Sequence, residues 1–143
     1  MRVLIDADGC PVVDIAIRIC KFAKTECILL CDTAHEFHKD GASTLVFDKG
    51  ADSVDFAIAN RVSAGDLVIT QDYGLASMCL AKGARILHQD GWEYTTDNID
   101  GLLTFRYESR KERVRTGRFK GPKRRCQDQN LIFEKTLKQI LIP

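Results

Sequence analysis

Short apolar runs alternate with amphipathic segments along the first 90 residues, and this alternation constrains the fold more than any other feature of the sequence. Five apolar runs have the length of strands and are bounded by turn residues: 3–5, 27–30, 44–47, 67–70 and 84–87. Three segments between them have helical spacing: from Pro11 to about residue 24, 53–63 and 75–82. Strands that alternate with helices predict an α/β fold with three layers, a mainly parallel sheet with helices on both faces.

The character of the chain changes after Trp92. We predict a helix from Thr95 or Thr96 to about residue 116, a basic loop over 117–126 and a last helix over 131–141. Trp92 and Tyr94 are interpreted as closing the core beneath this tail. At 143 residues the chain is predicted to form a single domain, 1–143, in which an α/β core (1–94) carries an appended helical basic C-terminal extension (95–143).

Basic residues concentrate in one stretch, although the net charge of the chain is only +1. Residues 106–125 contain ten Lys or Arg and two Glu, hence +8, which leaves eleven basic and eighteen acidic residues, hence −7, elsewhere. A basic surface recruits a polyanion, whereas an acidic surface repels one unless cations neutralise it.

The six cysteines are interpreted as reduced thiols, because a chain of this length can build a core without disulfides. Cys27 and Cys31 with His35 and His38 have a spacing that suggests zinc, but buried cysteines are the favoured interpretation. No run approaches the roughly 20 apolar residues that span a bilayer. We therefore expect a cytoplasmic protein without a membrane partner, and a homo-oligomer is left open.

Aspartates follow the predicted strands, at the edge where parallel sheets bind ligands. Asp6 and Asp8 come after the first strand with their side chains on the same side, and Asp72 follows the fourth. Asp52 and Asp55 share a face at a helix start. The alternative for Asp52, Asp55 and Asp72 is helix capping.

Carboxylates that meet at one site repel one another unless a cation intervenes. Oxygen ligands without suitably spaced His or Cys favour Mg²⁺ or Mn²⁺. We therefore predict a metal site that hydrolyses phosphodiesters with activated water. The predicted metal ligands are Asp6, Asp8, Asp52, Asp55 and Asp72, and the predicted catalytic residues are Asp6, Asp8 and Asp72.

The basic stretch offers the substrate contacts for such a reaction. Arg106, Arg110 and Arg113 share one helical face, and Thr70 at a strand end offers a hydroxyl to metal or phosphate. The predicted substrate-binding residues are Thr70, Arg106, Arg110, Arg113, Lys120, Lys123, Arg124 and Arg125. The alternative for the basic stretch is a solvated helix in which Glu108 and Glu112 pair with neighbours.

Three motifs resemble the YaiI/YqxD family of bacterial proteins, and the resemblance covers nearly the whole chain. They are Ile5-Asp-Ala-Asp-Gly-Cys-Pro-Val12, Gly50-Ala-Asp-Ser-Val-Asp55 and Gly65-Asp-Leu-Val-Ile-Thr-Gln-Asp-Tyr-Gly-Leu-Ala76. Shorter matches follow at Lys82-Gly-Ala84, Gly121-Pro122, Asp128 and Phe133.

That family is in turn similar to PIN-domain nucleases. The resemblance implies a PIN-like fold, with Asp6 as the acid after the first strand and Asp72 as the acid after the fourth. Asp52 or Asp55 stands where PIN domains usually carry Glu. RNA, rather than DNA, is the expected substrate only through this resemblance.

Two other functions stay open. Val3-Leu-Ile-Asp-Ala-Asp-Gly9 also resembles the first motif of haloacid-dehalogenase phosphatases, which would make Asp6 a nucleophile and Asp8 a general acid, but the later acidic pair of those enzymes is not found near Asp90. A non-catalytic module that binds nucleic acid or protein is the second alternative, with its aspartates acting as caps.

Overall fold

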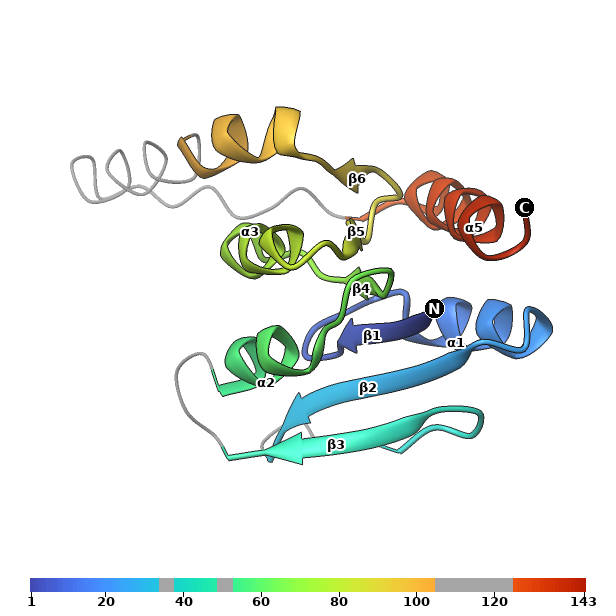
Figure 1. Ribbon diagram of the computed structural model, residues 1–143. Coiled ribbons are helices and arrows are strands. Elements are labelled where there is room, and N and C mark those ends of the chain that lie inside the picture. Colours follow the sequence, from blue (N-terminus) through green and yellow to red (C-terminus); the bar gives the residue numbers. More distant parts are fainter. Residues whose placement is uncertain (34–37, 49–52, 105–124) are drawn as a thin grey trace.

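The computed structural model describes residues 1–33, 38–48, 53–104 and 125–143. Its sheet contains β1 (Arg2–Asp6), β2 (Glu26–Asp32), β3 (Ser43–Phe47), β4 (Leu67–Ile69), β5 (Arg85–Leu87) and β6 (Glu93–Tyr94). The strand order is β3-β2-β1-β4-β5-β6. The strands from β1 to β5 pair in parallel, and β6 pairs with β5 in the antiparallel direction (Figure 1). The predicted α/β class with a mainly parallel sheet is confirmed.

Helices cover both faces of this sheet, as the alternating pattern predicts. They are α1 (Val13–Phe22), α2 (Ser53–Arg61), α3 (Tyr73–Ala81), α5 (Gln127–Leu141) and a helix over residues 96–104 that borders the undescribed segment. One buried cluster joins the sheet to α1 and α5, and a second joins it to α2, α3 and the helix at 96–104. The molecule therefore has three layers.

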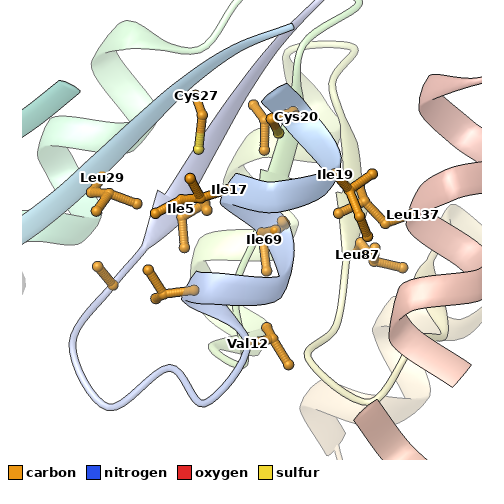
Figure 2. Close-up of a cluster of buried hydrophobic side chains, with 14 of the residues drawn as sticks. Ile5, Val12, Ile17, Ile19, Cys20, Cys27, Leu29, Ile69, Leu87 and Leu137 are labelled. Atoms are coloured by element: carbon orange, nitrogen blue, oxygen red, sulfur yellow. The ribbon is translucent and has the colours of Figure 1, made fainter. Parts of the chain in front are cut away.

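The central strands are buried on both faces, which explains their continuous apolar sequence. Side chains alternate along a strand, so Val3 and Ile5 of β1 pack toward α1 while Leu4 packs toward α2. All three are 0% exposed. Figure 2 shows the first cluster, in which Ile19 of α1 lies against Leu137 of α5.

The C-terminal helix α5 completes the core on the α1 side. Its Phe133 and Leu137 are both 0% exposed, and Arg18 of α1 pairs with Glu134 of α5. The backbone also approaches closely here, since a Cβ added at Gly91 would lie 2.7 Å from the Phe133 nitrogen. The tail that the sequence presents as appended to the sheet thus contains a helix on which the first core cluster depends.

The helix at residues 96–104 begins where the sequence predicts. The Thr95 hydroxyl accepts a hydrogen bond from the Asn98 backbone N–H at 3.2 Å, and Asn98 Oδ1 accepts from the Thr95 N–H at 2.9 Å. Such reciprocal contacts satisfy two N–H groups at a helix start. Tyr94 is 1% exposed beneath this helix, which confirms its predicted place in the core. The predicted course to residue 116 lies outside the described residues.

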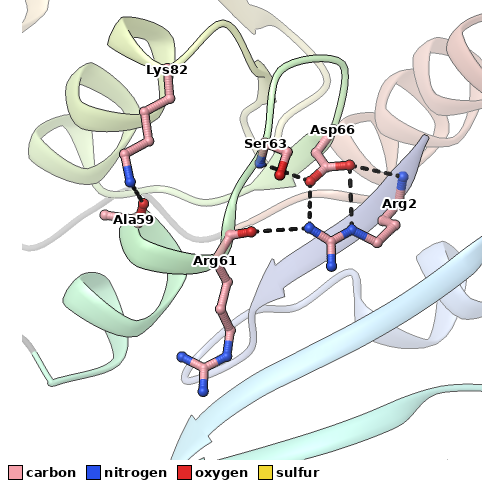
Figure 3. Close-up of polar contacts among 6 residues, drawn as sticks. All are labelled: Arg2, Ala59, Arg61, Ser63, Asp66 and Lys82. Atoms are coloured by element: carbon pink, nitrogen blue, oxygen red, sulfur yellow. Dashed lines mark hydrogen bonds and ion pairs between the residues drawn. The ribbon is translucent and has the colours of Figure 1, made fainter.

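Asp66 ties the start of β4 to the start of β1 (Figure 3). Its carboxylate accepts hydrogen bonds from Arg2 Nη2 at 2.8 Å and from the Ser63 backbone N–H at 2.9 Å, while Arg2 also donates to the Arg61 carbonyl at 3.0 Å. Burial works to raise the pKa of Asp66, but these hydrogen bonds and the Arg2 charge lower it below its ordinary value. This network gives Asp66 a structural role at the start of the sheet.

The cysteines follow the prediction of reduced thiols. All six lie in the described ranges as free cysteines. Cys27 and Cys31 are 3% and 0% exposed, as expected of buried apolar residues, while His35 of the zinc alternative lies outside the described residues. Among the helices that the structure describes, none has both the length and the apolar character needed to cross a bilayer.

Candidate functional site

An aspartate stands at the carboxyl end of every parallel strand. Asp6 ends β1 with Asp8 two residues on, Asp32 ends β2, Asp48 follows β3, Asp72 follows β4 by three residues and Asp90 follows β5 by three. Because parallel strands share one carboxyl edge, these carboxylates gather along one side of the sheet. Asp6, Asp8 and Asp72 were predicted site residues, whereas Asp32, Asp48 and Asp90 were not. The sequence pattern that could have indicated them is an Asp one to three residues after each predicted strand.

Thr70 connects the two acids that the resemblance to PIN domains singles out. Its Oγ1 donates a hydrogen bond to Asp6 Oδ2 at 2.9 Å and accepts one from the Asp72 backbone N–H at 3.0 Å. Thr70 is only 2% exposed. The ends of the neighbouring strands β1 and β4 are therefore held together through one buried hydroxyl.

Asp6 is the electrostatic centre of this edge. Burial raises its pKa to about 6, the Thr70 hydrogen bond partly opposes that rise, and the negative charges of Asp72 and Asp8 add to it. A carboxyl group whose charge is opposed by two other carboxylates is a site that a proton or a cation would stabilise. Asp6 is thus within electrostatic reach of Asp8 and Asp72, and the predicted role of the three acids as metal ligands stays a prediction.

Each of the three carboxylates also has a hydrogen-bonding role in the fold. Asp8 Oδ2 accepts from the Asp32 backbone N–H at 3.2 Å and so connects the ends of β1 and β2. Asp72 Oδ1 accepts from the Leu75 N–H at 3.0 Å and is the N-cap of α3. The capping alternative for Asp72 is confirmed.

The predicted acids of α2 are only partly described. Asp55 lies in the first turn of α2, and its negative charge adds to the raised pKa of Cys79 in α3, where burial is the main cause and Lys82 opposes. Asp52 lies outside the described residues. The structure therefore places Asp55 toward α3, and its predicted metal contact stays a prediction.

The metal site is not preformed in the described part of the chain. Within those ranges, no group of three or more His, Cys, Asp or Glu side chains is arranged to hold a metal ion. The donor chemistry nevertheless suits a hard divalent cation, because the acids around Asp6 offer carboxylate oxygens whose charges oppose one another.

Of the basic residues predicted to bind substrate, Arg125 lies within the described ranges. Its Nη1 pairs with Asp90 Oδ1 at 2.5 Å, its Nη2 donates to the Gln89 carbonyl at 2.7 Å, and its Nε donates to Asn130 Oδ1 at 2.8 Å. The other predicted basic residues lie outside the described ranges: Arg106, Arg110, Arg113, Lys120, Lys123 and Arg124.

Cys10 lies within electrostatic reach of both Asp6 and Arg125. Burial raises the pKa of the Cys10 thiol to about 11, a backbone hydrogen bond at Val12 opposes this, the Asp6 charge adds to it and the Arg125 charge opposes it. Cys10 is therefore within electrostatic reach of both groups, and Arg125 is fixed near the acidic edge.

Comparison with known proteins identifies the family of this chain. Residues 4–143 match the model of a family described as "Uncharacterized BCR, YaiI/YqxD family". A "UPF0178 protein" of Exiguobacterium sibiricum is 46% identical over 141 residues, covering 99% of this chain and 96% of the relative. Another, of Natranaerobius thermophilus, is 44% identical over 143 residues, covering 99% and 97%.

A third relative, a "UPF0178 protein" of Clostridium acetobutylicum, is 40% identical over 144 residues, covering 99% of this chain and 97% of the relative. No solved structure matches the chain. The family model includes the motif of Asp6 and Asp8, the strand that ends at Thr70 and the α5 helix that completes the core. From this full-length agreement, which confirms the resemblance of the sequence motifs, we conclude that the chain belongs to the YaiI/YqxD family.

Proposed function

We propose that this chain is a nuclease that hydrolyses RNA phosphodiesters with Mg²⁺ or Mn²⁺ at the acidic edge of its sheet. The observation that carries the proposal is the contact of Asp6 and Asp72 through the buried Thr70 hydroxyl at the carboxyl ends of β1 and β4, with Asp8 also within electrostatic reach of Asp6. Aspartates with a purely structural role are most stable when they are far from other carboxylates or close to a Lys or Arg side chain. Asp6 instead has two further carboxylates within electrostatic reach, an arrangement typical of divalent-cation sites.

Asp6, Asp8 and Asp72 would hold the cation, with Asp52 or Asp55 as a further ligand. When bound, a divalent ion supplies the Lewis acidity that hydrolysis of a phosphodiester by water requires. The protein's own part is positioning: the Thr70 hydroxyl orients Asp6 and receives the Asp72 N–H, so that both acids are placed before any ligand arrives.

Asp6 would exchange its proton for the cation close to neutral pH. Metal ligands must be deprotonated, so cation affinity depends on pH wherever a ligand titrates. With the pKa of Asp6 at about 6 in the metal-free protein, we expect cation affinity to increase as the pH rises through that value.

The basic stretch 106–125 supports nucleic acid as the substrate. Its charge of +8 offers phosphate contacts that act mainly through electrostatics. Arg125, its last residue, is held near the acidic edge by Asp90 and Asn130. RNA is preferred over DNA through the resemblance to PIN domains.

A second candidate is a module that binds nucleic acid without cleaving it. Asp6, Asp8 and Asp72 each accept a hydrogen bond from the protein, and no metal-holding group of three side chains occurs among the residues described. Under this alternative the same carboxylates serve to join strand ends and to cap α3.

Labelled single-stranded RNA incubated with the full chain and Mn²⁺ or Mg²⁺ separates the two candidates. The nuclease proposal expects cleavage that a chelator abolishes and that Asp6→Asn removes. Asp14→Asn is the matched control, because it also removes one carboxylate but from an 80% exposed side chain on α1. Purified control and wild-type chains should cleave at the same rate.

Three outcomes would overturn the nuclease proposal. RNA bound but left intact with either cation would favour the binding module. Cleavage that persists in Asp6→Asn would identify a contaminating enzyme. Hydrolysis of a small phosphomonoester such as p-nitrophenyl phosphate, without RNA cleavage, would favour a phosphatase.

A further inference from the structure

His88 lies in a polar arrangement just beyond β5 that the proposed reaction does not use. Its Nδ1 accepts a hydrogen bond from the Asp90 backbone N–H at 3.0 Å and lies 3.6 Å from Asp90 Oδ2. The other oxygen of that carboxylate, Oδ1, pairs with Arg125 at 2.5 Å. One carboxylate therefore stands between a titratable ring and a guanidinium group.

The contacts of the ring define its protonation state. A nitrogen that accepts a hydrogen bond from a backbone N–H carries no proton, so His88 is neutral with its proton on Nε2. The ring is stacked on Trp92, with centroids 4.4 Å apart and planes inclined by 12°, and its side chain is 11% exposed. Tyr94 lies on a further side, 5.9 Å from the ring centroid.

The charged groups facing His88 are Asp90 from its own loop and Arg125 from the segment that leads into α5. Burial lowers the pKa of His88, the Asp90 charge opposes that change, and the Arg125 charge adds to it. The neutral ring is thus the favoured state at neutral pH, and acid is needed to charge it.

We propose that His88, Asp90 and Arg125 form an acid-sensitive latch, closed while His88 is neutral and opened when its Nδ1 is protonated. In the closed state Arg125 is held to the loop after β5 by Asp90 and by the Gln89 carbonyl. The latch rests on these contacts alone and does not depend on the proposed nuclease activity.

Protonation opens the latch by placing two donors against each other. A proton on Nδ1 would face the Asp90 N–H across 3.0 Å, so the turn at residues 88–90 must change. The charged ring, whose Nδ1 lies 3.6 Å from Asp90 Oδ2, also repels the Arg125 guanidinium that is paired with Oδ1 of the same carboxylate. Both effects weaken the contact between Asp90 and Arg125.

The consequence reaches the acidic edge, because the Arg125 charge acts on Cys10, which also senses Asp6. Opening the latch would remove a fixed positive charge from this edge at low pH. The residue that moves is the last of the basic stretch 106–125.

An NMR titration of the full ¹⁵N-labelled chain tests the latch. The His88 ring signals are assigned by their loss in His88→Asn, and the guanidinium signals of Arg125 by their loss in Arg125→Lys. We expect both sets to change at one shared midpoint, below the ordinary histidine pKa of about 6.5. Trp92, the single tryptophan, should change its fluorescence at the same midpoint because it is stacked on His88.

His88→Asn is also the matched control. An Asn side chain can accept the N–H two residues on, as His88 does, but it cannot be protonated. In this variant the Arg125 signals should stay unchanged from neutral pH down to the range in which carboxylates titrate. If the variant does not fold, the wild-type midpoints still decide.

The latch is contradicted if His88 titrates while the Arg125 signals stay in place. It is equally contradicted if the Arg125 signals change in a transition that leaves the His88 ring signals unchanged. A His88 ring that stays neutral until the protein unfolds would show that it is a buried core residue only.

Discussion

The Thr70 hydroxyl donates a hydrogen bond to Asp6 across 64 residues of sequence, with 2.9 Å between Oγ1 and Oδ2. The contact exists because β1 and β4 are neighbours in the sheet, with Ile5 opposite Ile69, so that the next residue of each segment, Asp6 and Thr70, meet. The same hydroxyl oxygen accepts the Asp72 N–H, which directs the hydroxyl proton toward Asp6. The position of the Asp6 carboxylate and its pKa therefore both depend on Thr70.

Replacing Thr70 with Val should raise the pKa of Asp6 above about 6, because the hydrogen bond from Thr70 favours the ionised carboxylate. We also expect the free energy of unfolding to fall by about 1 to 3 kcal/mol, since a buried acceptor loses its donor. Carboxyl ¹³C signals followed against pH measure the first effect, and urea denaturation measures the second.

Thr70→Ser is the control for this change, because Ser keeps the hydroxyl and loses only a methyl group. The pKa of Asp6 in the Ser variant should stay close to that of the wild type. An unchanged pKa in the Val variant would show that Asp6 does not receive this hydrogen bond in solution.

Asp6→Asn should stabilise the metal-free protein at neutral pH. The pKa of Asp6 is about 6 in the folded chain, against about 3.9 for an unfolded Asp. Between these values the folded state binds more protons than the unfolded state, so the wild-type free energy of unfolding decreases as pH rises through this window. Asn removes that loss and can still accept from Thr70.

The expected gain is about 1 to 3 kcal/mol at pH 7, declining toward pH 4. Denaturant midpoints of wild type and variant, recorded with chelator over this pH range, measure it. A constant difference between the two proteins at all pH values would mean that the pKa of Asp6 is not raised.

Variants of Asp72 can distinguish its helix-capping role from its proposed role as a metal ligand. Asp72→Ala should lower the free energy of unfolding by about 0.5 to 2 kcal/mol, because the Leu75 N–H at the start of α3 loses its acceptor. Asp72→Ser should retain most of the stability, since Ser also caps helices. If Asp72 is a metal ligand, the Ser variant keeps its stability and loses RNA cleavage, and retained cleavage would limit Asp72 to the cap.

Much of the architecture could be predicted from the sequence, because strand and helix periodicities are local properties. The run at residues 3–5 became β1, and the pattern at 53–63 became α2, with ends shifted by only a few residues. Asp6 and Asp72 were predictable candidates for a related reason, because each lies beyond a buried strand and parallel strands end at one edge.

Contacts between distant segments were not predictable in this way. Asp90 and Arg125 meet through the packing of the loop after β5 against the start of α5, and no local pattern indicates their pairing. The two-residue strand β6 is too short to give a period. The Thr70 hydroxyl, which joins the Asp6 carboxylate to the Asp72 backbone N–H, likewise connects segments 64 residues apart.

Asp66 should make the free energy of unfolding decrease at low pH. Because the pKa of Asp66 is lowered in the folded chain, its contribution is present above the unfolded Asp value of about 3.9 and is lost as the pH falls through the folded value. Asp66→Ala should therefore cost about 1 to 3 kcal/mol at pH 7, because the Ser63 N–H and Arg2 lose their acceptor. The difference from wild type should shrink in acid.

Asp40→Asn provides the comparison for Asp66. Asp40 also pairs with a cation, Lys21, but its side chain is fully exposed, and exposed ion pairs contribute little to stability. Thermal denaturation at two pH values distinguishes the pairs. Equal effects of Asp66→Ala and Asp40→Asn would contradict the assigned role of the buried network at the start of β1.

The last helix should be essential for the stability of the sheet. Phe133 is 0% exposed in the cluster formed with α1, so Phe133→Ala is expected to reduce the free energy of unfolding by about 3 to 5 kcal/mol through lost burial and a cavity. Leu131→Ala on the same helix is the control, because Leu131 is 56% exposed and should change stability by less than about 0.5 kcal/mol. Urea denaturation of both variants measures the contrast. Similar small effects would show that α5 does not pack on α1 in solution, and the covering of that face of the sheet would then have to come from another segment.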